Sequence, residues 1–239
     1  MAMPKALLEE QIQAAPRYTG AEYLEQERAA EARHEFMDGE TYAMAGESPQ
    51  HADISANLVG ELVAQLKGKP CRVRTKDTKV RSGPLPFSPR KQKGLFAYPD
   101  AVVICGTPEY LDAYCDVVTN PTVIFEVLSP STAFHDRHLK FQRYDKWSPT
   151  LSDYVLIWQI IPFVEHYQRQ ADGSWLYRNY EGLEHVVPLE NIGCTLELAA
   201  LYDRVEFPPE ESELEESEEE VAADGETLDE DAAAATATE

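Results

Sequence analysis

Residues 98–105 read YPDAVVIC, and residues 121–128 read PTVIFEVL. Each stretch contains a short, continuous apolar run of the kind that forms a strand buried on both faces of a sheet. Each also carries one acid, Asp100 at the start of the first run and Glu126 inside the second. The connection between the runs is long enough for the two strands to pair side by side. The sequence therefore predicts two carboxylates next to each other in a buried sheet.

The flanking sequence adds helices and further strands. Apolar spacing and capping residues predict helices over 19–32, 48–66 and 133–147. The pair Asp38-Gly39 predicts a hairpin turn within 36–43, and alternation predicts one strand over 72–81 followed by a loop over 82–94. Three more strands over 154–160, 163–169 and 174–180 form a predicted meander. The expected fold class is α/β or α+β, with a mixed central sheet flanked by helices.

Charge divides the 239-residue chain into a body and a tail. Fourteen of the 43 acids lie between Pro208 and Glu239, where there is no Lys or Arg, so the rest of the chain carries 29 acids against all 21 bases. Such a tail has too few large apolar residues to fold alone. We expect an arm at 1–18, one domain at 19–207 and a disordered acidic tail at 208–239. The tail serves either as a solubiliser or as a competitor of nucleic acid for a basic site.

Composition excludes several classes of protein. No apolar run approaches the ~20 residues of a membrane-spanning helix, and no secretory signal is visible at the N-terminus. The four cysteines (Cys71, Cys105, Cys115 and Cys194) are scattered and form no metal-binding pair. This usage predicts a reduced, cytoplasmic protein without a disulfide framework.

The bases are concentrated in two segments. Ten of the 21 lie between Lys67 and Lys93 with one acid among them, and four more lie at Arg137, Lys140, Arg143 and Lys146. An acidic protein that gathers its bases in this way has an anion to hold there, unless the segments are only solvated faces of a strand and a helix. The residues expected to contact nucleic acid are Arg72, Arg74, Lys76, Lys79, Arg137 and Arg143.

The two buried acids favour a metal site. A charge inside a buried strand is costly unless it is paired or bound to a cation. For either acid alone, a carboxylate satisfied by Arg or by backbone N–H groups is the simpler reading. For Asp100 and Glu126 together, hard oxygen ligands at close range favour Mg²⁺ or Mn²⁺. The ammonium of Lys140 on the following helix could orient water or neutralise developing charge, or it could form only a surface pair with Asp136.

Five motifs in order carry a family resemblance: Arg33–Glu40 (RHEFMDGE), Met44–His51 (MAGESPQH), Tyr98-Pro99-Asp100, Glu126–Thr132 (EVLSPST), and Asp136-Arg137 with Lys140. From about Thr19 to Phe207 the chain resembles the Uma2 family (DUF820) of the PD-(D/E)XK nuclease superfamily. The resemblance implies a restriction-endonuclease-like fold and metal-dependent phosphodiester hydrolysis. Asp100 matches the first acid of the superfamily pattern, and Glu126 matches the second.

One position departs from that pattern. The superfamily lysine stands two residues after the second acid, where this chain has Leu128. The resemblance implies that Lys140, on the neighbouring helix, takes the place of the superfamily lysine. Lys79 is the second candidate. Glu35 resembles an additional carboxylate of such nucleases, and His51 is either a polar contact or a structural histidine.

Two functions remain open. The first is an Mg²⁺- or Mn²⁺-dependent endonuclease in which Asp100 and Glu126 hold the metal, Lys140 aligns the water and Glu35 assists. Its expected partner is nucleic acid, with DNA preferred to RNA, and a homodimer is possible. The second is an inactive protein of nuclease fold that binds nucleic acid or a protein partner.

Overall fold

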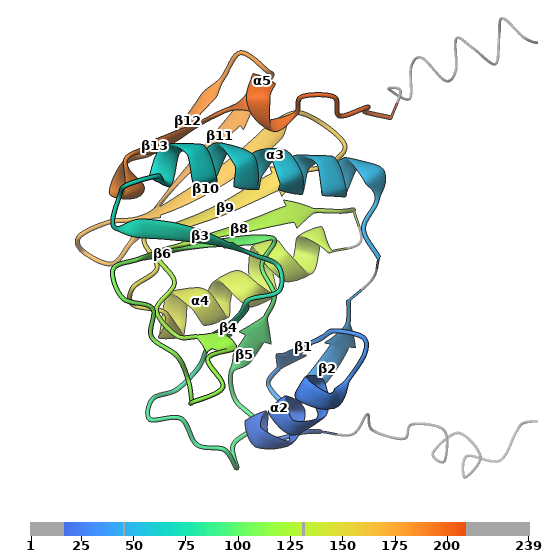
Figure 1. Cartoon of the computed structure of the whole chain (residues 1–239), viewed down its shortest axis with the longest axis vertical. Helices are drawn as coiled ribbons and strands as arrows, with labels where there is room; N and C mark the ends of the chain where they lie inside the picture. The colour runs from blue at the N-terminus through green and yellow to red at the C-terminus, as the bar shows by residue number, and fades with distance from the viewer. Residues whose placement is uncertain (1–16, 45, 131, 209–239) are drawn as a thin grey trace, which may run out of the picture. The chain divides into compact units, whose positions relative to one another are not determined.

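The computed structural model describes residues 17–44, 46–130 and 132–208 (Figure 1). The chain divides into two units, residues 1–205 and 206–239. Most of the predicted acidic tail, and most of the predicted N-terminal arm, lie outside the described residues. The domain boundaries therefore stay predictions.

The first described elements are a capped helix and a hairpin. Helix α2 (Gly20–Ala29) starts at Thr19, whose side chain and that of Glu22 form a capping box, and it ends three residues earlier than expected. Strands β1 (His34–Met37) and β2 (Glu40–Ala43) follow. Asp38 and Gly39 both have positive φ, 49° and 101°, as the predicted type I′ turn requires.

This hairpin belongs to a five-stranded sheet with the order β2-β1-β5-β4-β7. The other members are β4 (Lys79–Ser82), β5 (Leu95–Ala97) and β7 (Val117–Val118). Helix α2 packs on this sheet through Tyr23, which contacts the rings of Phe36 and Phe96 at 5.2 and 5.3 Å between centroids.

The second sheet has six strands in the order β11-β10-β9-β8-β6-β3. The strands are β3 (Cys71–Thr75), β6 (Ala101–Cys105), β8 (Val123–Leu128), β9 (Asp153–Trp158), β10 (Phe163–Arg169) and β11 (Trp175–Glu181). Only β8 and β9 pair in parallel among these, so the sheet is mixed as predicted.

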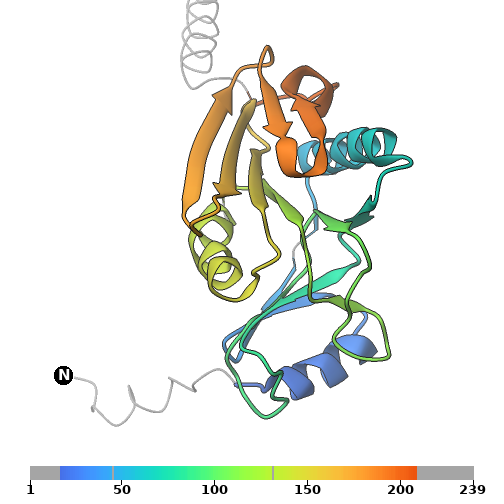
Figure 2. The same cartoon turned by 90° about the vertical axis from the view of Figure 1, so that its left-hand side faces the viewer.

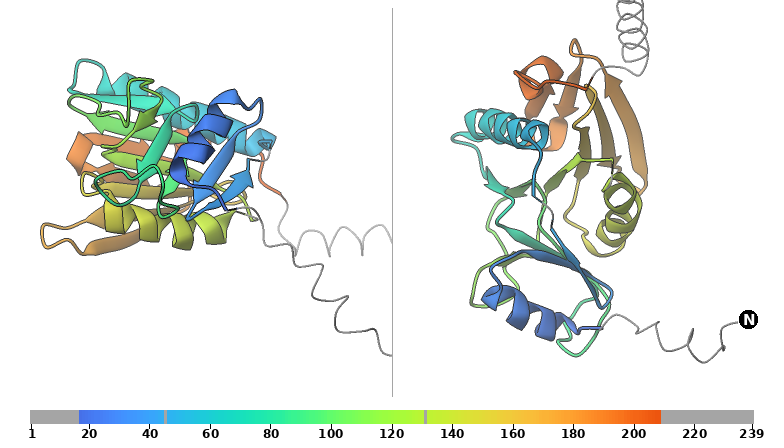
Figure 3. Two further views of the ribbon diagram at one scale, coloured as in Figure 1. Left: turned by 90° about the horizontal axis from the view of Figure 1, so that it is seen from below. Right: turned by 90° about the vertical axis from the view of Figure 1, so that its right-hand side faces the viewer.

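Helices cover both faces of this second sheet. Helix α3 (Pro49–Leu66) lies on one face and α4 (Phe141–Trp147) on the other (Figures 2 and 3). Ser48 caps α3, and the predicted row Ile54, Leu58, Leu62 and Leu66 is buried. A π-helical segment, η1 (His135–Lys140), leads into α4. The chain then forms a smaller hairpin, β12 (Val186–Leu189) and β13 (Cys194–Glu197), with a 3-10 turn η2 (Glu190–Ile192) between them and a short helix α5 (Leu198–Leu201) after them.

The single strand predicted over 72–81 is wrong. Residues 76–78 form a turn in which Thr78 N donates to Thr75 O, at 2.9 Å, and the chain passes from β3 in the larger sheet to β4 in the smaller one. Alternation of side chains has the same period in both strands, so the pattern alone could not show the break.

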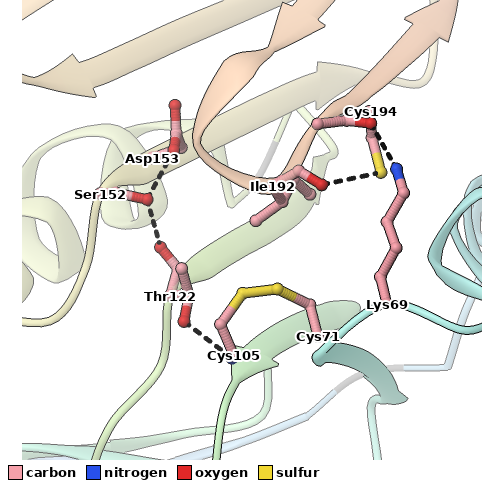
Figure 4. The surroundings of a disulfide bond; sticks show 9 residues. Lys69, Cys71, Cys105, Thr122, Ser152, Asp153, Ile192 and Cys194 are labelled. Carbon is pink, nitrogen blue, oxygen red and sulfur yellow. Dashed lines mark hydrogen bonds between the residues drawn. A yellow bond between two sulfur atoms is a disulfide. The ribbon is translucent and has the colours of Figure 1, made fainter.

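The expectation of four reduced cysteines is also wrong. Cys71 and Cys105 form a disulfide, while Cys115 and Cys194 are free (Figure 4). The two bonded residues are 34 positions apart in sequence but are direct cross-strand partners of β3 and β6, with their Cα atoms 3.9 Å apart. Only the strand pairing reveals this proximity.

In the described parts of the chain, 17–44, 46–130 and 132–208, no helix combines the length and the hydropathy that a bilayer crossing requires.

Candidate metal and phosphoryl-transfer site

Glu126 lies in β8, and Asp100 directly precedes the neighbouring antiparallel strand β6. Ala101 of β6 is the register partner of Phe125 of β8, so Asp100 stands opposite Glu126 one residue further along. Directly opposed residues share a face of a sheet. Asp100 is also bound to β8, because the residue after Glu126, Val127, donates its N–H to Asp100 Oδ2 at 2.6 Å. The register thus brings Asp100 next to Glu126 in the sheet, while Asp100 Oδ1 pairs with His51 and Glu126 Oε1 pairs with Lys140.

Lys140 of η1 contacts Glu126. Only 4% of its surface is exposed, and its Nζ lies 2.9 Å from Glu35 Oε1, 2.9 Å from Asp136 Oδ1 and 3.2 Å from Glu126 Oε1. The ammonium donates a hydrogen bond to Glu126 and forms ion pairs with Glu35 and Asp136. The π-helical turn that carries Asp136 and Lys140 is of a type often found at functional sites. Glu35, on β1, also belongs to this cluster. Its Oε1 accepts a further hydrogen bond from Tyr98 N at 3.1 Å, which holds the carboxylate in place.

The cluster carries more negative than positive charge. Burial raises the pKa of Glu126 well above its ordinary value, and the carboxylates of Asp136, Glu35 and Asp100 raise it further against the opposing effect of Lys140. Burial alone would lower the pKa of Lys140, but the charges of Asp136, Glu126 and Glu35 outweigh burial and raise that pKa. One lysine is therefore shared among several acids, and the charge of Glu126 is not fully compensated.

A second group of possible metal ligands adjoins Asp100. One ligand atom each from Glu47, His51 and Asp100 lies within 4.8 Å of the others. His51 Nε2 and Asp100 Oδ1 are 2.7 Å apart. Burial would lower the pKa of His51, but the hydrogen bond and charge of Asp100 raise it overall.

Glu47 and Asp136 are the site residues that the sequence argument missed. Both had a usable signal, because each is spaced i, i+4 from a residue already considered, Glu47 from His51 and Asp136 from Lys140. Of the two alternatives for Lys140, a surface pair with Asp136 does not fit, because only 4% of either residue is exposed.

Five of the six predicted nucleic-acid contacts have partners within the protein, and the sixth is exposed. Lys79 is buried, and its Nζ lies 3.1 Å from Asp116 Oδ2 and 3.2 Å from the hydroxyl of Tyr98. This setting does not fit a role in contacting phosphates, or in supplying the lysine that is missing at position 128, where the chain has Leu. Each of four others has a partner within the protein, Arg74 with Tyr110, Lys76 with Glu47, Arg137 with Glu165 and Arg143 with Asp38. Arg72 is exposed on the edge strand β3.

Comparison with known proteins decides the family. The model of the Uma2 family, described as "Putative restriction endonuclease", matches residues 21–200. The chain belongs to the Uma2 family.

Two curated relatives of this Uma2 chain come from Synechocystis sp. The uncharacterized protein slr1290 is 30% identical over 192 residues, which cover 80% of this chain and 95% of the relative. The uncharacterized protein sll1609 is 34% identical over 164 residues, 69% of this chain and 88% of the relative.

A solved structure shares the Uma2 fold. It is "a putative nuclease belonging to DUF820 from Anabaena variabilis ATCC 29413", with a TM-score of 0.60 at 17% identity, covering 77% of this chain and 97% of that one. The predicted fold, a mixed sheet flanked by helices as in Uma2 nucleases, is confirmed. Leu128, at the usual lysine place, is fully buried and leaves that position without a cation.

Proposed function

We propose that this Uma2 chain is a metal-dependent endonuclease that hydrolyses phosphodiester bonds of nucleic acid. The observation that carries the proposal is the excess of carboxylates around Lys140, where burial and neighbouring acids raise the pKa of Glu126. Perturbed acids of this kind gather at catalytic sites. The match to a family of putative restriction endonucleases and the likeness to the putative nuclease from Anabaena variabilis support the same class of reaction.

The residues present fit a hard divalent cation. Asp100 and Glu126 offer oxygen ligands from adjacent strands, and Glu47 and His51 offer one more oxygen and a nitrogen beside Asp100. Carboxylates suit Mg²⁺ and Mn²⁺, and a histidine nitrogen is also accepted by Mn²⁺. A cation held here would offset the surplus of negative charge. Bound, it would polarise the scissile phosphodiester as a Lewis acid.

The protein side chains would divide the remaining work. Lys140 would neutralise charge that develops on the phosphate and hold the attacking water, since its ammonium lies in a buried setting where charge acts strongly. Glu35 and Asp136 would fix the position of that ammonium through their 2.9 Å contacts. We expect DNA as the substrate and keep a homodimer as an open expectation.

Plasmid nicking tests the proposal. Wild-type protein is expected to convert supercoiled plasmid to the open-circular form with Mg²⁺ or Mn²⁺ and not with EDTA. Asp100→Asn and Glu126→Gln, which keep the shape of each side chain, should reduce the rate by about 100-fold or more. Glu184→Gln, on a side chain that is 76% exposed, is the matched control and should nick like wild type. Equal rates for all four proteins would contradict the proposal.

A second function is favoured by a specific feature of the same cluster. With Leu128 buried and Lys140 paired with three carboxylates, the acids could form a closed ion cluster in an inactive binding protein. Calorimetric titration with Mg²⁺ and Mn²⁺ separates the two. Heat of binding that disappears in Asp100→Asn favours the nuclease, and no binding by wild type favours the inactive protein.

A further inference from the structure

A cavity of about 220 Å³ lies between the turn of the β1–β2 hairpin and helix α4. It is lined by Asp38, Lys93, Gln142, Arg143, Lys146 and Trp147. Three of these six side chains are cationic and one is acidic. Lys93 and Lys146 are exposed, so a ligand in the cavity could reach both ammonium groups.

The same two parts of the chain build this cavity and the candidate catalytic cluster. Lys140 contacts Glu35 at 2.9 Å, and three residues further along each segment Arg143 contacts Asp38 at 2.8 Å. Three residues advance a helix by about 4.5 Å and a strand by about 10 Å. A nucleic-acid strand carries one negative charge per about 3.4 Å of axis. The cavity therefore lies within a few nucleotides of a phosphate held at Lys140.

Asp38 holds the walls of the cavity together but balances only one of its three positive charges. Its Oδ2 accepts from Arg143 Nη2 at 2.8 Å, and its Oδ1 accepts from Gly94 N at 2.9 Å. Both carboxylate oxygens are thus engaged by the protein, and they tie the loop that carries Lys93 to the helix that carries Lys146. The two lysines remain as surplus positive charge.

We propose that this cavity binds a phosphodiester group of the substrate strand beside the bond that is cleaved. The proposal rests on the proposed nuclease function and extends it to Lys93 and Lys146, which belong to the two basic segments of the sequence but are not among the six residues expected there to contact nucleic acid. Surplus cations in a polar cavity suit the anionic backbone of a nucleic acid rather than a neutral ligand. The contact would set the register of the strand and not read its bases.

A double variant, Lys93→Gln with Lys146→Gln, tests the cavity. Binding of a labelled oligonucleotide duplex is measured at several salt concentrations, with Ca²⁺ in place of Mg²⁺. We expect binding about threefold or more weaker and a salt slope lower by about 1 for each lysine that contacts phosphate. The matched control is Arg178→Gln with Arg204→Gln, which removes the same charge from two exposed side chains elsewhere. It should bind like wild type.

The outcomes separate this proposal from the nuclease proposal. Unchanged binding by the lysine variant, an equal loss in the control, or no binding by wild type overturns the cavity assignment whatever the nicking assay shows. Weaker binding by the lysine variant alone supports it even if no protein nicks plasmid, in which case the catalytic proposal fails by itself. Titration with inorganic phosphate is the last arm. Tight, lysine-dependent binding of free phosphate with unchanged oligonucleotide affinity would also overturn the proposal.

Discussion

At the scale of single residues, the buried charge of the site acts against the stability of the fold. Glu126 lies in the fully buried strand β8 and has only a share of Lys140 as counter-charge. An ionised carboxylate in such a place is costly unless a cation balances it. The acid that makes a metal site possible should therefore lower the stability of the metal-free protein.

Glu126→Gln is expected to raise the melting temperature of the metal-free protein at pH 7. Because the pKa of Glu126 is raised above its ordinary 4.5, ionisation of this group opposes folding. The stability contributed by the neutral acid is fully present below pH 4.5 and is lost as the pH rises through the raised pKa. Each 1 kcal/mol gained adds about 2–4 °C for a domain of this size. Calorimetry from pH 4 to pH 8 checks this prediction, and the increase in melting temperature should disappear at pH 4.

A matched exposed acid is the control for that measurement. Glu184→Gln should leave the melting temperature unchanged at every pH, since its side chain is 76% exposed. A lower melting temperature for Glu126→Gln at pH 7 would show that the ion pair with Lys140 outweighs burial.

At the scale of elements, turns and strand pairings bring the site together. The β1–β2 hairpin carries Glu35 in one strand and Asp38 in its turn, so it serves both the catalytic cluster and the cationic cavity. Its shape depends on positive φ at two consecutive residues.

Gly39→Ala is expected to destabilise the hairpin by about 1–2 kcal/mol. Gly39 has φ of +101°, and a Cβ there would also meet the side chain of Gln92 at 3.3 Å. Gly46→Ala is the control, since no heavy atom lies within 4 Å of a Cβ built there. Urea unfolding of the two variants gives the free energies, and equal stabilities would contradict the role given to the turn.

The disulfide bond between β3 and β6 gives a second prediction at the scale of elements. Replacing Cys71 and Cys105 by Ser, which opens a loop with a sequence separation of 34, should cost about 2–4 kcal/mol. Reductant should destabilise wild type by a similar amount and leave the double variant unchanged. If reductant affects both proteins equally, or neither, the disulfide does not stabilise the fold.

At the scale of the whole molecule, charge is distributed unevenly along the chain. Of the 43 acids, fourteen follow Pro208, and the net charge of −22 would become −8 without them. A long-range repulsion of this size acts against the approach of nucleic acid.

Deleting residues 209–239 is expected to strengthen duplex binding and to steepen its dependence on salt. On the reading of the tail as a competitor for basic side chains, the deletion removes a tethered polyanion, so more counterions should be released when the duplex binds. The melting temperature should stay nearly the same, because the deleted composition has little apolar surface to bury. Binding of one duplex at two salt concentrations checks this, and equal affinities and slopes would leave the tail without a regulatory role.

Local patterns in the sequence determined most of the elements. Caps and apolar periods fixed α2 and α3, Asp38-Gly39 fixed the hairpin turn, and the two apolar runs fixed β6 and β8 with their acids. Each of these depends on residues that are close in the chain, and so it can be read from spacing alone. The family motifs, which occur in order along the chain, then indicated which residues were candidates for the site.

Only the tertiary structure decided which distant residues meet. It broke the segment 72–81 between two sheets, joined Cys71 to Cys105, buried Lys79 against Asp116 and placed three carboxylates on Lys140. These outcomes follow from strand register and burial, which are set by packing of the whole domain and leave no mark at a fixed sequence spacing. The sequence alone thus determined which residues can do chemistry, and the three-dimensional structure decided which of them lie together.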